Sequence, residues 1–424
     1  MAQRTPQAPR MYDRRIMRRT LLLLVTAAGF AAAQQVVQFK DHVIEANAKG
    51  GYAVIVTDIN KDGKPDVIGI SQQLPDLTWY ENPGWQPHVI VKDLLGQVNL
   101  AAYDIDGDGI PEIALESGFA MQQAKSPGLV WLLSHVGDPR EPWKSTKLDA
   151  FPTSHHIAWA DVDGDGKKEL INAPLVGDTN AAPKYEGNTP LFFYRVPKDW
   201  SSDSASWKRQ TITDNLSGIT HRVRVVNWTG KGKQEQLLVA SFEGVVMYSA
   251  SGKGDSLKWN KKIIVKGHDS EPAPRLGASD VKIAHLGKHR ILATVEPWHG
   301  NEVVVYTEDG KGGWNRHVIY DQLTEGHEVC VGDFNGDGRD EIVAGDRARN
   351  KVSTSHVFYS ADDSGMNWHH EELDHLAMSA SGCQVADMNG DGRPDIVMIG
   401  GATHNIKWYE NLGPMSTASV SKSR

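Results

Sequence analysis

The segment SHHIAWADVDGDGKKELINAPL (154–175) places an acidic nine-residue loop between two apolar runs. The loop follows the pattern D-x-[DN]-x-D-G-x-x-[DE], and the chain contains it five times. Oxygen ligands at positions 1, 3, 5 and 9, with glycine at position 6 for the sharp turn, suit Ca²⁺ or Mg²⁺. The sequence therefore predicts about five structural cation sites. Their expected ligands are Asp58, Asn60, Asp62 and Asp66; Asp104, Asp106, Asp108 and Glu112; Asp161, Asp163, Asp165 and Glu169; Asp333, Asn335, Asp337 and Glu341; and Asp387, Asn389, Asp391 and Asp395.

The residues around each loop distinguish it from an EF-hand. An EF-hand needs a bidentate glutamate at position 12 and a helix on each side. After the acid at position 9, this chain continues with a short apolar run of the β type, such as EIVAG (341–345). We therefore expect a strand on each side of every loop. Position 12 is occupied by Gly69, Leu115, Asn172, Ala344 and Met398.

The loop belongs to a longer repeat. Alignment of the loops reveals two decayed copies, one at 227–235 and one at 283–296, where the loop shortens to a tight turn. Each unit continues with a third strand, such as LTWYEN (77–82), and a fourth that opens with tryptophan, such as WQPHVI (85–90). Seven units of four short strands predict an all-β fold, a seven-bladed β-propeller. In the first decayed copy the loop positions are held by Asn227, Thr229, Lys231, Gly232 and Glu235.

The two ends of the repeat predict how the ring closes. The last unit stops after its third strand, at Asn411, whereas FKDHVIEA (39–46) has the fourth-strand pattern. We expect this N-terminal strand to complete the seventh blade. The predicted propeller covers 34–413, and a disordered tail is expected at 414–424.

The N-terminus has the features of an export signal. Arginines precede the apolar run TLLLLVTAAGF (20–30), and small residues follow it at 31–33. This pattern predicts a secretory signal peptide over 1–33 and a secreted or periplasmic protein. The apolar run is too short for a stable membrane span. A retained membrane anchor is the alternative interpretation.

The charge of the chain limits its expected partners, and its two cysteines allow at most one disulfide. Without residues 1–33 the chain has 39 Lys and Arg against 52 Asp and Glu, with no basic run, so we expect no nucleic-acid partner. The two cysteines, Cys330 and Cys383, fall on the predicted inner strands of the sixth and seventh units. Two buried thiols are the simpler expectation, and a disulfide would need Cα atoms within about 7 Å.

The register of the loops identifies a candidate site. The first strand of each propeller blade lines the central channel, so the residues six and five places before each loop surround one mouth of it. Polar and titratable residues gather there in the third to sixth blades, as an active or binding site requires. Histidine can act there as a general base. The candidate catalytic residues are His155, His156, His221, Arg222, His327 and Glu328.

Two alternatives remain open for this mouth. A polar ring can simply solvate the ends of the inner strands. A zinc site is the other alternative, with His155, His221 and His327 as ligands.

Two longer connections are expected on the same face. VEPWHGNEVVVY (295–306) carries a tryptophan that suits the apolar face of a sugar ring, and PLVGDTNAAPKYEGNTPL (174–191) exceeds the usual loop length. Functional loops are often of this kind. With two residues of the mouth, they supply the candidate substrate-binding residues Tyr52, Asp280, Trp298, His299, Lys184 and Tyr185.

The loops with their flanking strands resemble the FG-GAP and VCBS repeats of integrin-type and secreted bacterial propellers. A second resemblance is to the propeller domain of the aldos-2-ulose dehydratases, also called 1,5-anhydrofructose dehydratases. Several of the segments that carry it lie at the channel mouth and not in the repeated scaffold. They are TWYENPGWQPHVI (78–90), SHHIAWADVDGDGKKELINAPL (154–175), THRVRVVNW (220–228), EPWHGNEVVVY (296–306) and EGHEVCVGDFNGDGRDEIVAGD (325–346).

This resemblance implies a lyase that removes water from a keto-sugar. A base takes the acidic proton next to the ketone, the β-hydroxyl leaves, and polar groups hold the enolate-like oxygen. The resemblance implies His155 or His156 as the base and Arg222 as the oxyanion partner. Members of that family carry cupin and lectin-like domains after the propeller, which this sequence lacks, so we expect dehydration alone. The alternatives are a non-catalytic propeller that binds carbohydrate or protein, and a polysaccharide lyase.

Overall fold

The computed structural model describes Met1 and residues 35–178, 180–202, 206–347 and 353–415. The chain divides into two units, Met1–Gln34 and Gln35–Arg424, and the fold described below is that of the second. The expected signal segment (1–33) and nearly all of the expected tail (414–424) lie outside the described residues, so both stay predictions.

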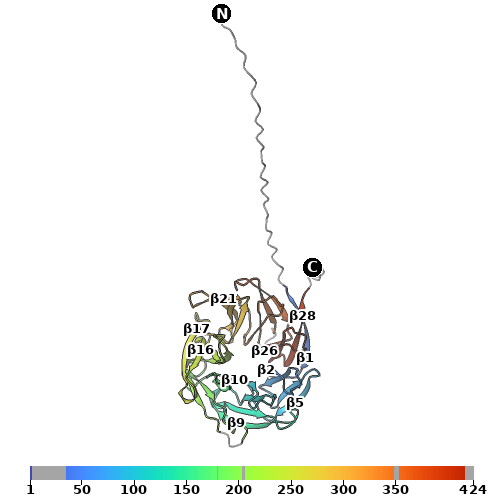
Figure 1. Cartoon of the computed structure of the whole chain (residues 1–424), viewed down its shortest axis with the longest axis vertical. Helices are drawn as coiled ribbons and strands as arrows, with labels where there is room; N and C mark the ends of the chain where they lie inside the picture. Colours follow the sequence, from blue (N-terminus) through green and yellow to red (C-terminus); the bar gives the residue numbers. More distant parts are fainter. Residues whose placement is uncertain (2–34, 179, 203–205, 348–352, 416–424) are drawn as a thin grey trace. The chain divides into compact units, whose positions relative to one another are not determined.

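Seven antiparallel sheets of four strands each surround a central channel, with β2, β10 and β26 next to it and β5, β9 and β17 at the periphery (Figure 1). The seven-bladed β-propeller expected from the repeats is confirmed. Two short 3₁₀ helices, Gln123–Lys125 and Gly254–Ser256, are the helical elements of the described ranges.

In six blades the strands follow one another in the chain, from the channel outward, and in blade seven the outermost strand is the N-terminal β1. Blade one contains β2 (Gly51–Thr57), β3 (Asp66–Ser71), β4 (Leu77–Glu81) and β5 (Gln86–Val91). Blade two contains β6 (Asn99–Tyr103), β7 (Glu112–Ser117), β8 (Leu129–Ser134) and β9 (Lys144–Ala150). Blade three contains β10 (Ser154–Ala160), β11 (Glu169–Pro174), β12 (Asn188–Tyr194) and β13 (Gln210–Ser217). Blade four contains β14 (Thr220–Val226), β15 (Gln236–Ser241), β16 (Gly244–Ser251) and β17 (Lys258–Val265). Blade five contains β18 (Asp280–Leu286), β19 (His289–Glu296), β20 (Glu302–Glu308) and β21 (Trp314–Tyr320). Blade six contains β22 (Val329–Gly332), β23 (Glu341–Gly345), β24 (Ser355–Ser360) and β25 (Trp368–Asp374). Blade seven contains β26 (Ala380–Ala386), β27 (Asp395–Gly400), β28 (Asn405–Pro414) and β1 (Val37–Glu45).

The core lies between the blades. The second strands are almost entirely buried, as in β27, because each sheet packs between two neighbouring sheets. The fourth strands alternate between partly buried and exposed residues, as in β17, because one of their edges faces solvent. Apolar runs therefore mark the second strands, and mixed polar runs mark the rim.

The ring closes through the N-terminal strand, as expected. β1 pairs antiparallel with β28, with His42 opposite Trp408, and their rings lie 4.5 Å apart. The expectation of two separate thiols is wrong: Cys330 on β22 and Cys383 on β26 form a disulfide, with their Cα atoms 6.1 Å apart. The disulfide links blade six to blade seven, the blade in which the N-terminal and C-terminal strands pair.

The acid at position 9 fastens each acidic loop to its blade. In five blades this residue opens the second strand, and its carboxylate accepts a hydrogen bond from the backbone N–H of loop position 2. In blade three, for example, Glu169 accepts from Val162 at 3.2 Å. These interactions hold the loop in one conformation before any cation binds.

The decayed loop of blade four is one residue longer than expected. Gln236, and not Glu235, opens β15, and its side-chain oxygen accepts from the Trp228 N–H at 2.8 Å. The Glu235 carboxylate instead accepts from the backbone N–H of Asp161 in blade three, at 2.7 Å. The expected alignment of Glu235 with position 9 is therefore wrong, because the glutamine side chain takes over the fastening role.

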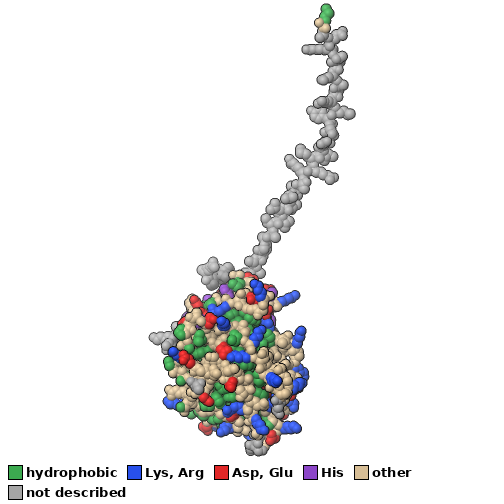
Figure 2. Space-filling view, turned by 90° about the vertical axis from the view of Figure 1, so that its left-hand side faces the viewer, with side chains coloured by type: hydrophobic (Ala, Val, Ile, Leu, Met, Phe, Trp, Pro, Cys, Tyr) green, Lys and Arg blue, Asp and Glu red, His purple; other side chains and the backbone are tan. Residues whose placement is uncertain are grey.

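The surface carries both signs of charge. On the face shown in Figure 2, Lys and Arg side chains are interspersed with Asp and Glu, so neither sign dominates that face. No helix in the described part of the chain has the length and hydropathy that a membrane crossing needs.

Candidate functional site

The inner strands connect two chemically different ends of the channel. Each strand starts among histidines and polar residues and, in five blades, ends at an acidic loop. From His155 to Asp161 the strand β10 extends by about 20 Å, at roughly 3.3 Å per residue. The acidic loops are therefore too far away to take part in chemistry at the strand starts.

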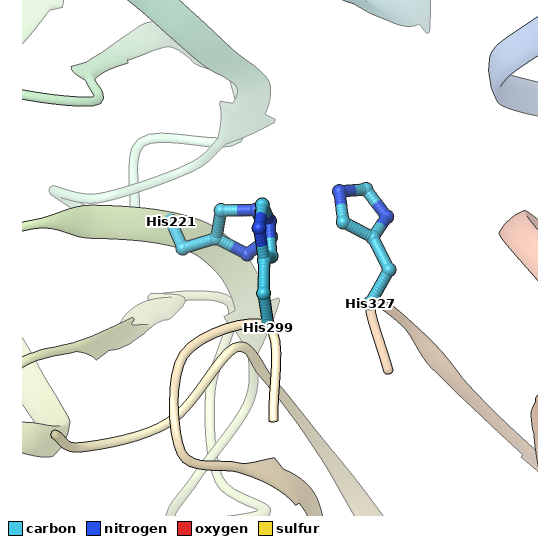
Figure 3. A group of neighbouring side chains, drawn as sticks. All are labelled: His221, His299 and His327. Atoms are coloured by element: carbon cyan, nitrogen blue, oxygen red, sulfur yellow. The ribbon is translucent and has the colours of Figure 1, made fainter. Parts of the chain in front are cut away.

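Three histidines from three separate segments meet at the strand starts (Figure 3). His221 lies on β14, His327 lies just before β22, and His299 lies on the loop between β19 and β20. Their ligand nitrogens all lie within 4.8 Å of one another, and the Nε2 atoms of His221 and His299 are 3.1 Å apart. Because the rings point toward a common centre, the group can hold a metal ion.

Backbone carbonyls determine the tautomers of two of these histidines. The Nδ1–H of His221 donates to the Ser279 carbonyl at 2.6 Å, and the Nδ1–H of His327 donates to the Ser381 carbonyl. Each Nε2 atom is therefore left with its lone pair facing the centre. This arrangement, in which the second ring nitrogen is held by an acceptor, is typical of metal-binding histidines.

Tyr52 and His155 complete the mouth. The Tyr52 hydroxyl lies 2.8 Å from Nε2 of His155 and 3.2 Å from Nε2 of His327. Because the His327 Nε2 has no proton in this tautomer, the hydroxyl cannot accept from His327, and it can donate its proton to His155 when Nε2 of His155 is unprotonated. We call the end of the channel that is formed by Tyr52, His155, His221, His299 and His327 the histidine mouth.

Burial favours the neutral form of three histidines of the histidine mouth. Burial, followed by the charge of Arg222, lowers the pKa of His155 to about 3. Burial also lowers the pKa values of His221 and His327 well below their ordinary range, and it raises the pKa of Tyr52. Neutral imidazoles present the lone pairs that a metal ion needs.

The loop that carries His299 is held in a strained conformation. His299 has a φ of 49°, in the left-handed region that is uncommon for residues other than glycine. Its backbone N–H donates to the Ser279 hydroxyl at 2.7 Å, and the N–H of Trp298 donates to the Leu276 carbonyl at 3.0 Å. These bonds direct the imidazole toward the channel.

An aromatic wall borders the histidine mouth. The Trp298 ring stacks on His299, with centroids 4.5 Å apart, and contacts Tyr185 edge to face at 5.6 Å. Phe242 contacts Trp298 edge to face, with ring centroids 5.9 Å apart. Trp298 and Tyr185 are both partly buried, so this wall offers an apolar face to a ligand at the mouth.

A cavity of ≈ 350 Å³ opens beside Tyr52. Arg347 lines it, with its guanidinium 3.3 Å from Nε2 of His299 and above the Tyr52 ring. Polar side chains on blades one and seven form the rest of its wall, among them Gln73 and His404. A small polar ligand can thus reach the histidine mouth from solvent.

Charged side chains of the inner strands form a separate layer next to the histidine mouth, further into the channel, which we call the ionic layer. Arg224 forms a two-bond pair with Asp280, at 2.8 and 2.6 Å, and also donates to Glu328 at 2.8 Å. Arg222 donates to the other oxygen of Glu328 at 3.1 Å, and its guanidinium lies 3.1 Å from Nδ1 of His327. Arg222, Glu328 and Asp280 therefore brace the histidine mouth from within the channel.

The structure brings together most, but not all, of the candidate site residues that the sequence predicted. His155, His221, His299 and His327 meet at the mouth with Tyr52, and Trp298 and Tyr185 stand beside it. His156 lines the channel on the inner side. Lys184 is exposed and pairs with Glu186 at 3.6 Å. The metal-compatible trio contains His299 where the sequence suggested His155.

Several residues of the site were not identified from the sequence. Arg347 lies within blade six, just after β23 and outside any strand, and nothing in the repeat places it near the channel. Arg224 and Lys282 lie at a strand position where the other blades have uncharged residues, a departure from the repeat that could have been noticed. The carbonyls of Ser279 and Ser381 act through their backbone, so their side chains carry no information about this role.

The acidic loops have the geometry of cation sites. The carboxylate oxygens of Asp104, Asp106 and Asp108 lie within 4.8 Å of one another, and a second such group contains Glu169. Burial raises the pKa of Glu169 to about 7, and the charge of Asp163 adds to this effect. A divalent cation would offset such a concentration of negative charge.

Comparison with known protein families agrees with both resemblances. The family model described as aldos-2-ulose dehydratase, beta-propeller domain, matches residues 127–309. An FG-GAP-like repeat matches residues 48–115, and an FG-GAP repeat matches residues 326–355. The chain thus resembles the dehydratase propeller and contains FG-GAP repeats.

Individual relatives divide between the same two groups. The aldos-2-ulose dehydratase of Phanerodontia chrysosporium is 22% identical over 345 residues, which covers 72% of this chain and 37% of that enzyme. The integrin alpha pat-2 proteins of Caenorhabditis elegans and Caenorhabditis briggsae are 37% identical over 103 residues, or 24% of this chain and 8% of their own length. The chain is a distant homologue of the dehydratase and spans little more than a third of its length.

Proposed function

We propose that this protein is an exported propeller lyase that removes water from a keto-sugar at the histidine mouth. One observation carries the proposal: the Nε2 atoms of His221, His299 and His327 converge beside the Tyr52–His155 pair. His221 and His299 lie within the segment that matches the dehydratase propeller. Export rests on the signal-like sequence at 1–33.

The donor set at the histidine mouth fits a zinc ion. Three neutral imidazoles with two Nδ1–H groups held by carbonyls leave an open coordination position, as in catalytic zinc sites. His221, His299 and His327 would hold the metal. When bound, zinc supplies Lewis acidity, which polarises a carbonyl oxygen and acidifies the neighbouring C–H bond.

The residues around the trio can move the proton. The Tyr52 hydroxyl takes the proton next to the ketone as it passes its own proton to Nε2 of His155, and the C–O bond to the β-hydroxyl then breaks. The proton returns through Tyr52 to the leaving hydroxyl, which departs as water, so protons and electrons balance. Arg347, and not Arg222, borders the cavity, and its charge favours an enolate oxygen there.

The aromatic wall and the cavity suit a sugar. Trp298 offers a flat apolar face to the C–H side of the ring, and the polar groups of the cavity can hydrogen-bond its hydroxyls. We assign substrate binding to Trp298, Tyr185 and Arg347. The exposed position of Lys184 gives it no part in this binding.

The five acidic loops hold structural Ca²⁺ or Mg²⁺ in this proposal. Their carboxylates are grouped and fastened to the second strands, about 20 Å from the histidine mouth. These cations would stabilise the blades without touching the substrate.

The test is turnover of a keto-sugar by the full chain. Protein supplied with zinc and calcium is incubated with 1,5-anhydrofructose or glucosone, and enone absorbance is followed. We expect absorbance to rise with the wild type and with His285→Ala, an exposed histidine on the loop side, and to fall to background with His299→Ala. A folded, metal-loaded wild type that forms no enone from either sugar would refute the proposal.

A non-catalytic binding propeller is the second candidate. The similarity to integrin alpha chains favours it, although that similarity covers only 24% of this chain. It predicts that a carbohydrate or protein ligand binds equally well after replacement of His155, His221 and His327. Loss of binding in these variants would favour the lyase.

A further inference from the structure

A second cavity lies inside the channel, on the loop side of the histidine mouth. It has a volume of ≈ 250 Å³ and is lined by the inner strands of several blades. Among the described residues that line it, the charged ones are Lys168, Arg222, Arg224 and Glu328. We call it the channel cavity. Its lining carries more positive than negative charge.

The one carboxylate of this lining is already saturated by arginines. Glu328 accepts from Arg224 through one oxygen and from Arg222 through the other. The neighbouring Asp280 accepts from Arg224 through both oxygens, and also from the backbone N–H groups of Val281 and Val329. These acids therefore have little remaining capacity to bind a cation in the cavity.

Buried donors in the same lining lack an acceptor. The Nε–H of Arg222 and the Nδ1 atom of His156 have no hydrogen-bond partner among the described residues, although the two residues are only 1% and 5% exposed. An unsatisfied buried donor costs about 1–3 kcal/mol, and more when it is charged. Such groups require an acceptor in the cavity.

A further lysine lies close to the charged residues of this lining, because the charges of Arg224, Glu328 and Arg222 all act on Lys282. Lys282 follows Asp280 on β18, and the carboxylates of Asp280 and Glu328 are both engaged by arginines. Burial, and then the charge of Arg224, lower the pKa of Lys282 to about 8. The ammonium is therefore held where a negative charge would stabilise it.

We propose that the channel cavity binds a small monovalent anion of halide or carboxylate size. Arg222 Nε–H and His156 would donate to the anion, and the charge of Lys282 would attract it. The channel cavity and the cavity beside Tyr52 share no lining residue, so this site is distinct from the proposed substrate site. The proposal does not depend on the dehydration reaction.

Bromide is the probe that tests the site. Crystals of the full chain grown with sodium bromide are measured at the bromine absorption edge, and we expect an anomalous peak in the channel cavity within hydrogen-bonding reach of Arg222. In solution, we expect bromide to raise the Tm of the wild type by roughly 2 °C.

Two variants separate a specific site from a general salt effect. Lys282→Met should abolish both the anomalous peak and the bromide-dependent rise in Tm. Lys262→Met, at an exposed position on β17, should keep both. An anomalous map of the wild type without a peak in the cavity would overturn the proposal, and so would a bromide effect of equal size in Lys282→Met. The wild-type map decides the matter even if Lys282→Met does not fold.

Discussion

Tyr52 connects the histidines that would hold a metal with the histidine that would accept a proton. Its hydroxyl is within hydrogen-bonding distance of both His155 and His327. Tyr52→Phe should lower kcat for keto-sugar dehydration by about 10²- to 10⁴-fold, the usual contribution of a proton-transfer group, with little change in KM. Steady-state kinetics measure this. Tyr103→Phe, at the loop end of β6, is the control and should stay near the wild-type rate. Equal rates for both variants would remove Tyr52 from the mechanism.

Arg224 is the residue on which the ionic layer depends. Arg224→Met would leave Asp280 and Glu328 buried without their main partner, so we expect a loss of about 3–5 kcal/mol in the free energy of unfolding. Urea denaturation measures the loss. Arg290→Met, at a partly exposed arginine between blades four and five, should be milder.

The same pair predicts a dependence on pH. The pKa of Asp280 is lowered: burial opposes this shift, and Arg224 outweighs burial. A carboxyl group whose pKa is depressed by folding stabilises the protein fully above its unfolded pKa, which is 3.8 here, and loses that contribution as the pH falls through the lower folded value. The wild type and Arg224→Met should therefore differ in stability at pH 7 and converge below about pH 4. A constant difference across this range would contradict the assignment.

At the scale of the acidic loop, we expect a bound cation to stabilise the fold and to take no part in the reaction at the histidine mouth. Excess chelator should lower Tm, because the grouped carboxylates of the acidic loops would repel one another without a cation. Asp161→Ala should lose part of this chelator effect. Thr229→Ala, in the decayed loop of blade four, should keep all of it. Differential scanning fluorimetry with and without calcium tests this, and a wild type equally stable in chelator would refute it.

The elements could be predicted from the sequence far better than the site. The acidic loop fixes where the first strand ends and the second begins, so the blades follow from their spacing. The role of Gln236 could not be predicted in this way. The loop of blade four is one residue longer than the others, and a glutamine stands where the other loops have an acid. The position of Arg347 could not be predicted because Arg347 lies outside the strands, where the repeat gives no register. His299 was placed on the correct face, but a sequence does not reveal that it approaches His221 more closely than His155 approaches the trio.

At the scale of the whole molecule, the ring is closed by strand pairing within blade seven, and a covalent bond ties that blade to blade six. The disulfide between Cys330 and Cys383 spans 53 residues. Disulfides of this kind typically stabilise by about 2–4 kcal/mol. Reduction should therefore lower Tm in the wild type and leave the Cys330→Ser/Cys383→Ser double variant unchanged. A wild type indifferent to reductant would show that closure rests on β1 and β28 alone.

The ring geometry also creates the site, because no single blade supplies more than one histidine of the metal-compatible trio.

The central claim is that a keto-sugar binds at the histidine mouth. The most direct test is a crystal of the zinc-loaded full chain soaked with 1,5-anhydrofructose. The account predicts ligand density between Trp298 and the Nε2 atoms of His221, His299 and His327, with the acidic carbon facing Tyr52. Ligand density at the acidic loops or elsewhere on the surface, with the histidine mouth empty, would contradict it.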